Sequence, residues 1–259
     1  MPQPAVVGLL YPGFGAEDDF AALEARLDGA IRLPLVHTSV GEDAHRVDAL
    51  LDLGSTLRLA AGARVLTAQR PHSVVWACTS GSFVFGWEGA RKQVEDVGTL
   101  LGLPVSSTSI GFVNATHAMR ISRVAIAASY PADVASAFVE FLVDGGIDAV
   151  AVSSRGIVTA AEVGRLDRDA VLAMARDADI GNAEALLVPD TAMHSLGWLN
   201  ALEAAVGKPV LTANQVTVWE GLRLLGPVPR FDSLGSLFEL EPVGSEARPP
   251  ASTGAGVAP

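Results

Sequence analysis

Cysteine is almost missing from this sequence, because its 259 residues include only one, Cys78. The chain can therefore form no intramolecular disulfide and no thiolate-rich zinc site. Charged residues are also sparse, at 18% against 49% hydrophobic residues, and this balance excludes a disordered chain. No apolar run approaches the ~18 residues that a membrane-spanning helix requires. These absences indicate a globular protein of enzyme size, built as one large domain or two smaller ones.

Basic residues are few as well, since 18 Lys and Arg face 29 Asp and Glu and give a formal net charge of −11. No basic cluster offsets this charge, so we expect no nucleic-acid partner. A bound anion must then be held locally by backbone amides, helix N-termini and hydroxyl groups. The start of the chain, MPQPAVVGLL, has neither the basic segment nor the small-residue cleavage site of a secretory signal. We therefore expect a cytoplasmic protein that binds no membrane.

Short apolar runs alternate with longer amphipathic stretches over most of the chain. This alternation is typical of β-α-β units and predicts an α/β fold with mostly parallel strands. The predicted strands fall into two groups of four, and they are Ala5–Leu10, Ile31–His37, Ser73–Ala77, Pro104–Ser107, Arg123–Ala128, Asp148–Val152, Ala185–Val188 and Pro209–Thr212. The predicted helices are Glu17–Leu27, Asp43–Gln69, Gly86–Leu101, Ala132–Val143, Asp167–Asp177, Ser195–Val206 and Val216–Leu225.

Two stretches of the sequence resemble each other, VVWACTSGSFVFGWEGARKQVEDVGTLLGLPVSSTS in the first half and ALLVPDTAMHSLGWLNALEAAVGKPVLTAN in the second. Each reads as a buried strand, an X-Thr step, a Gly-Trp helix and a further strand after Gly-x-Pro. In this register Cys78 matches Asp190, and Gly86-Trp87 matches Gly197-Trp198. Chance or common α/β sequence patterns produce part of such a likeness. Taken as a repeat, it predicts two similar domains that face each other across a pseudo-two-fold axis.

The predicted first domain comprises residues 1–113 with 216–240, and the second comprises 114–215. The last stretch, 241–259, is rich in Pro, Gly, Ala and Ser, and we expect a disordered tail there. This division leaves the two matched residues, Cys78 and Asp190, in different domains.

Cys78 and Asp190 would then lie at equivalent strand ends on opposite walls of one cleft, which is where open α/β sheets bind ligands. A thiol and a carboxylate in this arrangement suit proton transfer to the two faces of a planar carbon intermediate. The residues after Cys78 begin a helix, and the hydroxyls and amides of Thr79 and Ser80 are suited to hold a carboxylate. Each of the pair also has a structural alternative, with Cys78 as a small buried residue and Asp190 as a helix N-cap.

The histidines form no metal-binding pattern. Four of them have no metal-ligand spacing and are expected at the surface or in the core, namely His37, His45, His72 and His117. His194 lies four residues after Asp190, near the predicted cleft. We therefore expect no metal.

The segment Ala77-Cys78-Thr79-Ser80-Gly81-Ser82-Phe83 resembles the first active-site strand end of the aspartate/glutamate racemase superfamily. The most similar branch contains arylmalonate decarboxylases and maleate cis–trans isomerases. The resemblance covers about Val6 to Leu225, and the other segments that carry it are Gly8-Leu9-Leu10-Tyr11-Pro12, Ser129-Tyr130, Gly156-Ile157, Glu162-Val163-Gly164-Arg165 and Pro189-Asp190-Thr191. It implies two Rossmann-like (flavodoxin-like) domains with four-stranded parallel sheets, an active site in the cleft between them, and neither a metal nor an organic cofactor.

The resemblance implies a cofactor-independent, arylmalonate-type decarboxylase in which Cys78 protonates an enediolate and Asp190 belongs to the catalytic site. Such enzymes hold the retained carboxylate with a Thr-Ser pair and a Tyr, which this chain matches. The residues implied to bind substrate are Pro12, Thr79, Ser80, Tyr130 and Thr191. The expected partner is a small carboxylate substrate, and a homodimer is an open possibility.

The sequence departs from this branch in ways that leave alternatives open. Racemases and maleate isomerases have a second cysteine where this chain has Asp190, and maleate isomerases have asparagines at the positions of Gly15 and Ala160. Arylmalonate decarboxylases hold their single cysteine at the second strand end, so Cys78 would protonate the opposite face. One alternative is an isomerase or racemase with Cys78 as nucleophile or base. The other is a non-catalytic binder of small carboxylates.

Overall fold

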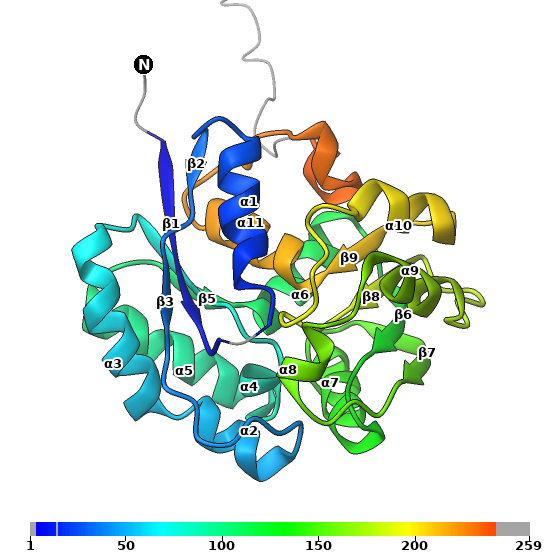
Figure 1. The fold of residues 1–259 in the computed structure, drawn as a ribbon, viewed down its shortest axis with the longest axis horizontal. Helices are drawn as coiled ribbons and strands as arrows, with labels where there is room; N and C mark the ends of the chain where they lie inside the picture. Colours follow the sequence, from blue (N-terminus) through cyan, green and yellow to red (C-terminus); the bar gives the residue numbers. More distant parts are fainter. Residues whose placement is uncertain (1–3, 14, 242–259) are drawn as a thin grey trace, which may run out of the picture.

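The computed structural model describes residues 4–13 and 15–241, which form two parallel β-sheets flanked by helices (Figure 1). The strands of the first sheet are β1 (Ala5–Tyr11), β2 (Ile31–Arg32), β3 (Leu35–His37), β4 (Ser73–Trp76) and β5 (Val105–Ser107). Those of the second are β6 (Arg123–Ala128), β7 (Asp148–Ser154), β8 (Ala185–Val188) and β9 (Val210–Thr212). All described strand pairs are parallel. The predicted α/β fold with two parallel sheets is confirmed.

Both sheets have the same strand order. The first runs β2-β1-β4-β5, with β3 also paired to β1, and the second runs β7-β6-β8-β9. We count β2 and β3 as one strand and number the strands of each half from one to four along the chain. Both sheets then have the order 2-1-3-4, with the first and third strands at the centre. The strands β4 and β8 are therefore equivalent, and both are fully buried, as expected for parallel strands covered on both faces.

The first sheet differs from the prediction in one respect. The strand expected over Ile31–His37 is broken into β2 and β3 at Leu33-Pro34, because proline has no N–H with which to continue the ladder. The carbonyl of Pro34 still accepts a hydrogen bond from the Leu9 N–H at 2.9 Å. This sheet consequently has five strands instead of four.

The helices of the first half are α1 (Glu17–Arg26), α2 (Val47–Leu53), α3 (Thr56–Leu66), α4 (Ser80–Phe83), α5 (Gly86–Leu101) and α6 (Thr108–Ala118). Those of the second half are α7 (Ala132–Asp144), α8 (Ala160–Val163), α9 (Arg168–Arg176), α10 (Leu199–Val206) and α11 (Ala213–Arg223). Short 3-10 helices are η1 (Thr67–Gln69), η2 (Asp232–Leu234) and η3 (Ser236–Glu239). None of the described helices combines the length and apolar character that crossing a membrane requires.

Several helix predictions need correction. The helix expected over Ser195–Val206 begins only at Leu199, and the short helix α8 is not predicted. The single helix expected over Asp43–Gln69 is two helices, α2 and α3, which are separated at Gly54-Ser55, and residues 38–46 before them form a loop. The helix α6 is not predicted from the sequence. Most of its side chains are buried, so it lacks the separate apolar and polar faces of an amphipathic helix.

The helices α6 and α11 pack against each other between the two sheets (Figure 1), and α11 also contacts β1, β4 and β5. Side chains from both halves, such as Leu9, Phe138 and Leu211, share one hydrophobic core cluster. The domain boundaries drawn from the sequence stay a prediction. The predicted tail, 241–259, lies outside the described residues except for Glu241.

Candidate active site

Cys78 and Asp190 stand at matching points of the two sheets. The strand β4 ends at Trp76 and β8 ends at Val188, so each candidate residue lies two positions beyond its strand. Both line one small cavity of about 40 Å³. The cavity lies between the halves, and its lining is Tyr11, Pro12, Gly13, Val40, Glu42, Asp43, Ala44, His45, Leu50, Leu53, Cys78, Ser80, Ala160, Asp190, Thr191 and Ala192. The structure therefore brings the two matched residues to the carboxyl ends of their strands, where α/β folds bind ligands.

The thiol of Cys78 is held in a nearly dry environment. The residue is 3% exposed, its Sγ accepts a hydrogen bond from the Gly81 N–H at 3.3 Å, and the Ser80 hydroxyl lies 4.0 Å away. Burial raises the pKa of the thiol from its ordinary 9.0 to about 12, and the contacts with Gly81 and Ser80 oppose this shift only in part. The negative charge of Asp190 adds to the rise in pKa. At neutral pH, Cys78 is therefore a protonated acid.

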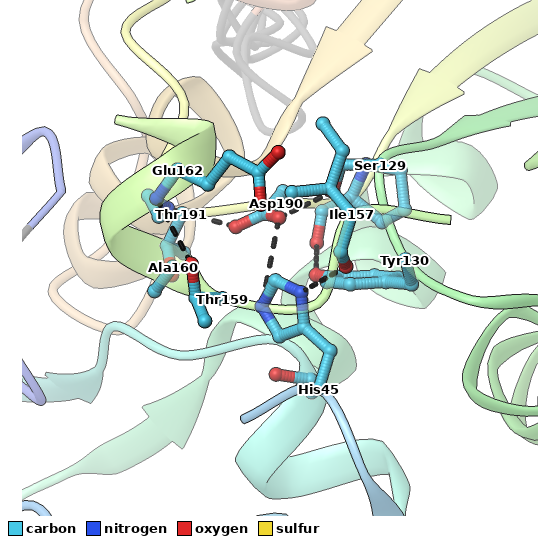
Figure 2. Close-up of polar contacts among 12 residues, drawn as sticks. His45, Ser129, Tyr130, Ile157, Thr159, Ala160, Glu162, Asp190 and Thr191 are labelled. Atoms are coloured by element: carbon cyan, nitrogen blue, oxygen red, sulfur yellow. Dashed lines mark hydrogen bonds and ion pairs between the residues drawn. The ribbon is translucent and has the colours of Figure 1, made fainter. Parts of the chain in front are cut away.

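The carboxylate of Asp190 is surrounded by hydrogen-bond donors. It is 5% exposed, its Oδ1 accepts from the Ala192 N–H at 2.9 Å, and its Oδ2 accepts from the Ser129 hydroxyl. The Nε2 atom of His45 lies 4.0 Å from the same Oδ2 (Figure 2). Through the Ala192 N–H, Asp190 stabilises the turn that follows β8, which agrees with its alternative interpretation as a capping residue. It also lines the cavity.

His45 reaches the cavity from the loop between β3 and α2. Its Nδ1 lies 2.9 Å from the Ile157 carbonyl oxygen, and its backbone N–H donates to the Val158 carbonyl at 2.7 Å. The ring meets the Tyr130 ring edge-to-face, with centroids 5.0 Å apart (Figure 2). His45 is buried, and it lies against the site. No sequence signal distinguishes it from the other histidines, because its partners come from distant segments.

The same loop is fastened to the second half by Asp43. One carboxylate oxygen of Asp43 accepts the Ala160 N–H at 2.8 Å, and the other accepts the Ala161 N–H at 3.1 Å. These are amides at the start of α8, which have no partner within their own helix. Asp43 and His45 together hold residues 38–46 across the cavity.

Of the three residues predicted to hold a carboxylate, Thr79, Ser80 and Tyr130, only Ser80 lines the cavity. Tyr130 is buried next to the side chains of Thr79 and Ser80, and its hydroxyl donates to the Pro189 carbonyl. Burial raises the pKa of the Tyr130 phenol well above its usual value, so it stays a hydrogen-bond donor. The buried Thr79 hydroxyl has no hydrogen-bond partner of ordinary geometry among the described residues. An unsatisfied buried hydroxyl of this kind calls for an explanation, and Thr79 directly precedes the cavity-lining Ser80.

Pro12 and Thr191, the remaining predicted residues, both line the cavity. The hydroxyl of Tyr11 joins their two loops, because it accepts from the Ala16 N–H at 2.9 Å and donates to the Thr191 carbonyl at 3.1 Å. Gly15 also lies in this region, and a Cβ added there would come 2.5 Å from the Ala192 Cα. The two loops approach so closely that position 15 has no room for a side chain. This explains why the chain has a glycine where maleate isomerases are expected to have an asparagine.

Other features of the described residues bear on the location of the site. Within residues 4–13 and 15–241, no group of three or more His, Cys, Asp or Glu side chains is placed to hold a metal ion. A larger hollow of about 810 Å³ lies beside α6, α11 and the segment that ends at Glu241, but it contains none of the predicted site residues. His194 lies outside the cavity, with its Nε2 2.7 Å from the Asp18 carboxylate.

Comparison with known proteins identifies relatives of this architecture. The sequence matches the model of the arylmalonate decarboxylase family over residues 54–238. It is 26% identical to maleate isomerase of Geobacillus stearothermophilus over 136 residues, which cover 52% of this chain and 54% of that protein. It is 28% identical to arylmalonate decarboxylase of Bordetella bronchiseptica over 131 residues, which cover 48% and 53% respectively. The match thus spans about half the length of these curated relatives.

The fold is also similar to that of solved structures. A variant of Nocardia farcinica maleate cis–trans isomerase with a covalently bound succinylcysteine intermediate superposes with a TM-score of 0.82 at 22% identity, covering 92% of this chain and 99% of that one. At this identity the similarity establishes the fold, whereas the family follows from the sequence match over more than half of the chain. The protein belongs to the arylmalonate decarboxylase family.

Proposed function

We propose that this protein is a cofactor-independent carbon-acid enzyme that decarboxylates a substituted malonate. The observation that carries the proposal is the pair Cys78 and Asp190, which reach one buried cavity from equivalent strand ends. Loss of CO2 breaks a carbon–carbon bond and leaves its electron pair on the α-carbon as an enediolate. The Cys78 S–H bond then breaks as a C–H bond forms, so the product keeps one carboxylate and the enzyme is left with a thiolate.

The surroundings of the cavity support this reaction. The Ser80 hydroxyl lines the cavity and would donate a hydrogen bond to the retained carboxylate, and the neighbouring unpartnered Thr79 hydroxyl would supply a second donor to the enediolate once the site opens. The Tyr130 hydroxyl donates to the Pro189 carbonyl and so fixes the loop beside them. No lysine or arginine lines the described cavity, and Val40, Leu50 and Leu53 are apolar. A carboxylate placed against these side chains is poorly solvated, and its conversion to neutral CO2 relieves that cost.

The protonation state of Cys78 favours decarboxylation over the alternative. An isomerase or racemase would use Cys78 as nucleophile or base, and both roles require a thiolate. Burial holds the pKa of Cys78 at about 12, so the thiol is ready to donate a proton but is a poor nucleophile at neutral pH. The isomerase or racemase stays the second candidate, because Asp190 faces the same cavity and could act as a partner of Cys78.

Substrate entry requires the cavity to open. Its volume of about 40 Å³ holds little more than a water molecule, whereas ligand pockets measure roughly 300–1,000 Å³. The loop over residues 38–46 contributes Val40, Asp43 and His45 to the lining and carries the contacts to residues 157–161. We infer that this loop moves away to admit the substrate and closes over it, which also excludes water from the reaction.

A panel of substituted malonates, maleate and amino acids in deuterated water tests the function. We expect release of CO2 from a malonate and incorporation of one deuteron at the α-carbon, observed by NMR. Deuterium exchange without CO2 release would instead identify a racemase, and conversion of maleate to fumarate an isomerase. Cys78→Ala should lose at least about 10²-fold in rate, the usual value of a general acid, with an unchanged melting temperature. A binder would show ligand affinity without turnover, unaffected by this substitution.

A further inference from the structure

We propose that His45 is a proton-relay residue that returns a proton to Cys78, through Asp190, after each turnover. This inference rests on the proposed function, in which Cys78 gives up its proton to the substrate. It assigns a role to His45, a buried side chain that takes no part in the protonation of the substrate by Cys78.

The need for a relay follows from the burial of Cys78. The residue is 3% exposed, and burial raises the pKa of its thiol. The thiolate left by the reaction is therefore poorly solvated, and it must regain a proton before the next turnover. Bulk solvent has little access to the sulfur while the loop over residues 38–46 is closed. A side chain inside the cavity that can accept and release a proton would supply it, and His45 lines the cavity.

The hydrogen bonds of His45 determine which of its ring nitrogens exchanges a proton. The Ile157 carbonyl, 2.9 Å from Nδ1, can only accept, so Nδ1 carries a hydrogen in both the neutral and the charged ring. The proton that His45 gains and loses is then on Nε2. This atom faces the Asp190 Oδ2 at 4.0 Å, an ion-pair separation longer than a hydrogen bond, so the transfer requires a small approach of the ring to Asp190 (Figure 2).

Asp190 is placed to pass the proton on. Ser129 and the Ala192 N–H hold its carboxylate in position, and it lines the cavity together with Cys78. The cavity that both residues line, of about 40 Å³, is large enough to hold one water molecule. In the proposed sequence, Nε2–H of charged His45 protonates Asp190, and Asp190 protonates the Cys78 thiolate. His45 regains its proton from solvent, so each turnover consumes one solvent proton.

The loop that carries His45 gives the relay its path to solvent. His45 lies between half-buried Ala44 and exposed Arg46, and its loop contacts residues 157–161. Opening for product release would expose the ring, and closure would return it to Asp190. The other titratable groups around His45 are Tyr11, Glu42, Asp43 and Cys78, which share the cavity, and Tyr130, which contacts its ring. None of them is an imidazole.

The test compares the first turnover with later ones in His45→Asn, whose amide can keep the hydrogen bond to the Ile157 carbonyl but cannot carry a proton. With enzyme in excess over the malonate, Cys78 already holds its proton, so we expect a single-turnover rate within about threefold of wild type. With substrate in excess, we expect a burst of one product per site and then a steady rate lower by about 10²-fold. His45→Gln is the second variant, and added imidazole should speed the steady phase of His45→Ala.

The control is His194→Asn, because His194 also contacts an aspartate but lies outside the cavity. It should show neither the burst nor the slow steady phase. Equal losses in both regimes for His45→Asn and His45→Gln would show that His45 only shapes the site, and unchanged rates would show that it is dispensable; either result overturns the relay. If wild-type enzyme releases no CO2 from any malonate, the proposed function fails and the relay fails with it, so the two failures are distinguishable.

Discussion

The thiol of Cys78 and the carboxylate of Asp190 face one cavity from the two halves of the chain, each from the second residue after a fully buried strand. The equivalence extends to the helices that follow, because α5 and α10 both end at a left-handed glycine, Gly102 with φ 65° and Gly207 with φ 74°. The two sheets, which share one strand order, thus present different chemical groups to the same cavity. Whichever group is the acid should determine the face of the intermediate that receives the proton.

Moving the thiol from position 78 to position 190 should therefore invert the configuration of the product. The double substitution Cys78→Gly with Asp190→Cys moves the thiol to the other strand end and leaves Thr79, Ser80 and Tyr130 in place. A prochiral malonate should give the opposite enantiomer, even if the rate falls by orders of magnitude through imperfect placement of the acid. Chiral chromatography of the product measures this. An active double variant with unchanged handedness would mean that the two residues do not address opposite faces.

Thr79→Val should separate activity from stability. The Thr79 hydroxyl is buried without a hydrogen-bond partner of ordinary geometry, so its replacement by a methyl group of similar size removes an unsatisfied polar group. We expect an unfolding free energy equal to or above that of wild type, with kcat/KM lower by about 10²-fold through the loss of one donor to the carboxylate.

Thr108→Val is the matched control for this substitution. The Thr108 hydroxyl lies 2.6 Å from the Thr217 hydroxyl in the buried contact of α6 with α11. This variant should lose about 1 kcal/mol of stability and keep its activity. A stability loss in Thr79→Val as large as that of the control would indicate a structural role for Thr79.

Stability at alkaline pH should depend on Cys78. The folded pKa of the thiol, about 12, exceeds its ordinary value of 9.0, so the protonated thiol favours the folded state. This contribution is fully present below pH 9 and is lost as the pH rises from 9 towards 12, by at most about 1.4 kcal/mol per pH unit. Denaturant unfolding at pH 7.5, 9.5 and 10.5 should show a steeper decline for wild type than for Cys78→Ala. Parallel declines would contradict a buried, protonated thiol.

Asp43→Ala should loosen the loop over residues 38–46. The substitution removes the hydrogen bonds that the Asp43 carboxylate accepts from the Ala160 and Ala161 N–H groups. Amide hydrogen exchange in the loop should accelerate, and kcat/KM should fall because the site no longer closes firmly. In the control, Asp167→Ala, an aspartate is lost that caps α9 at the Ala170 N–H. It should cost about 1 kcal/mol without an effect on activity. Equal activity of the two variants would argue against closure by Asp43.

Much of the fold can be predicted from the sequence because it rests on local patterns. Buried strands such as β4 and β8 are short apolar runs, and the helix α5 ends at a glycine, so periodicity and turn residues locate them. The internal repeat pairs Cys78 with Asp190, since equivalent strands carry equivalent residues. Hydrophobic periodicity does not predict the break between β2 and β3 at Pro34. It also misses α6, because this helix is buried on most sides and has no amphipathic period.

The sequence by itself determined the α/β class, the equivalence of the two strand ends and the residue types that stand there. Only the tertiary structure decided that residues 38–46 cross to the second half and place His45 beside Asp190. Those contacts join residues more than a hundred positions apart, and no local propensity encodes them. The acidity of Cys78 was likewise decided by the fold, because its pKa depends on how much water packing removes from around the sulfur.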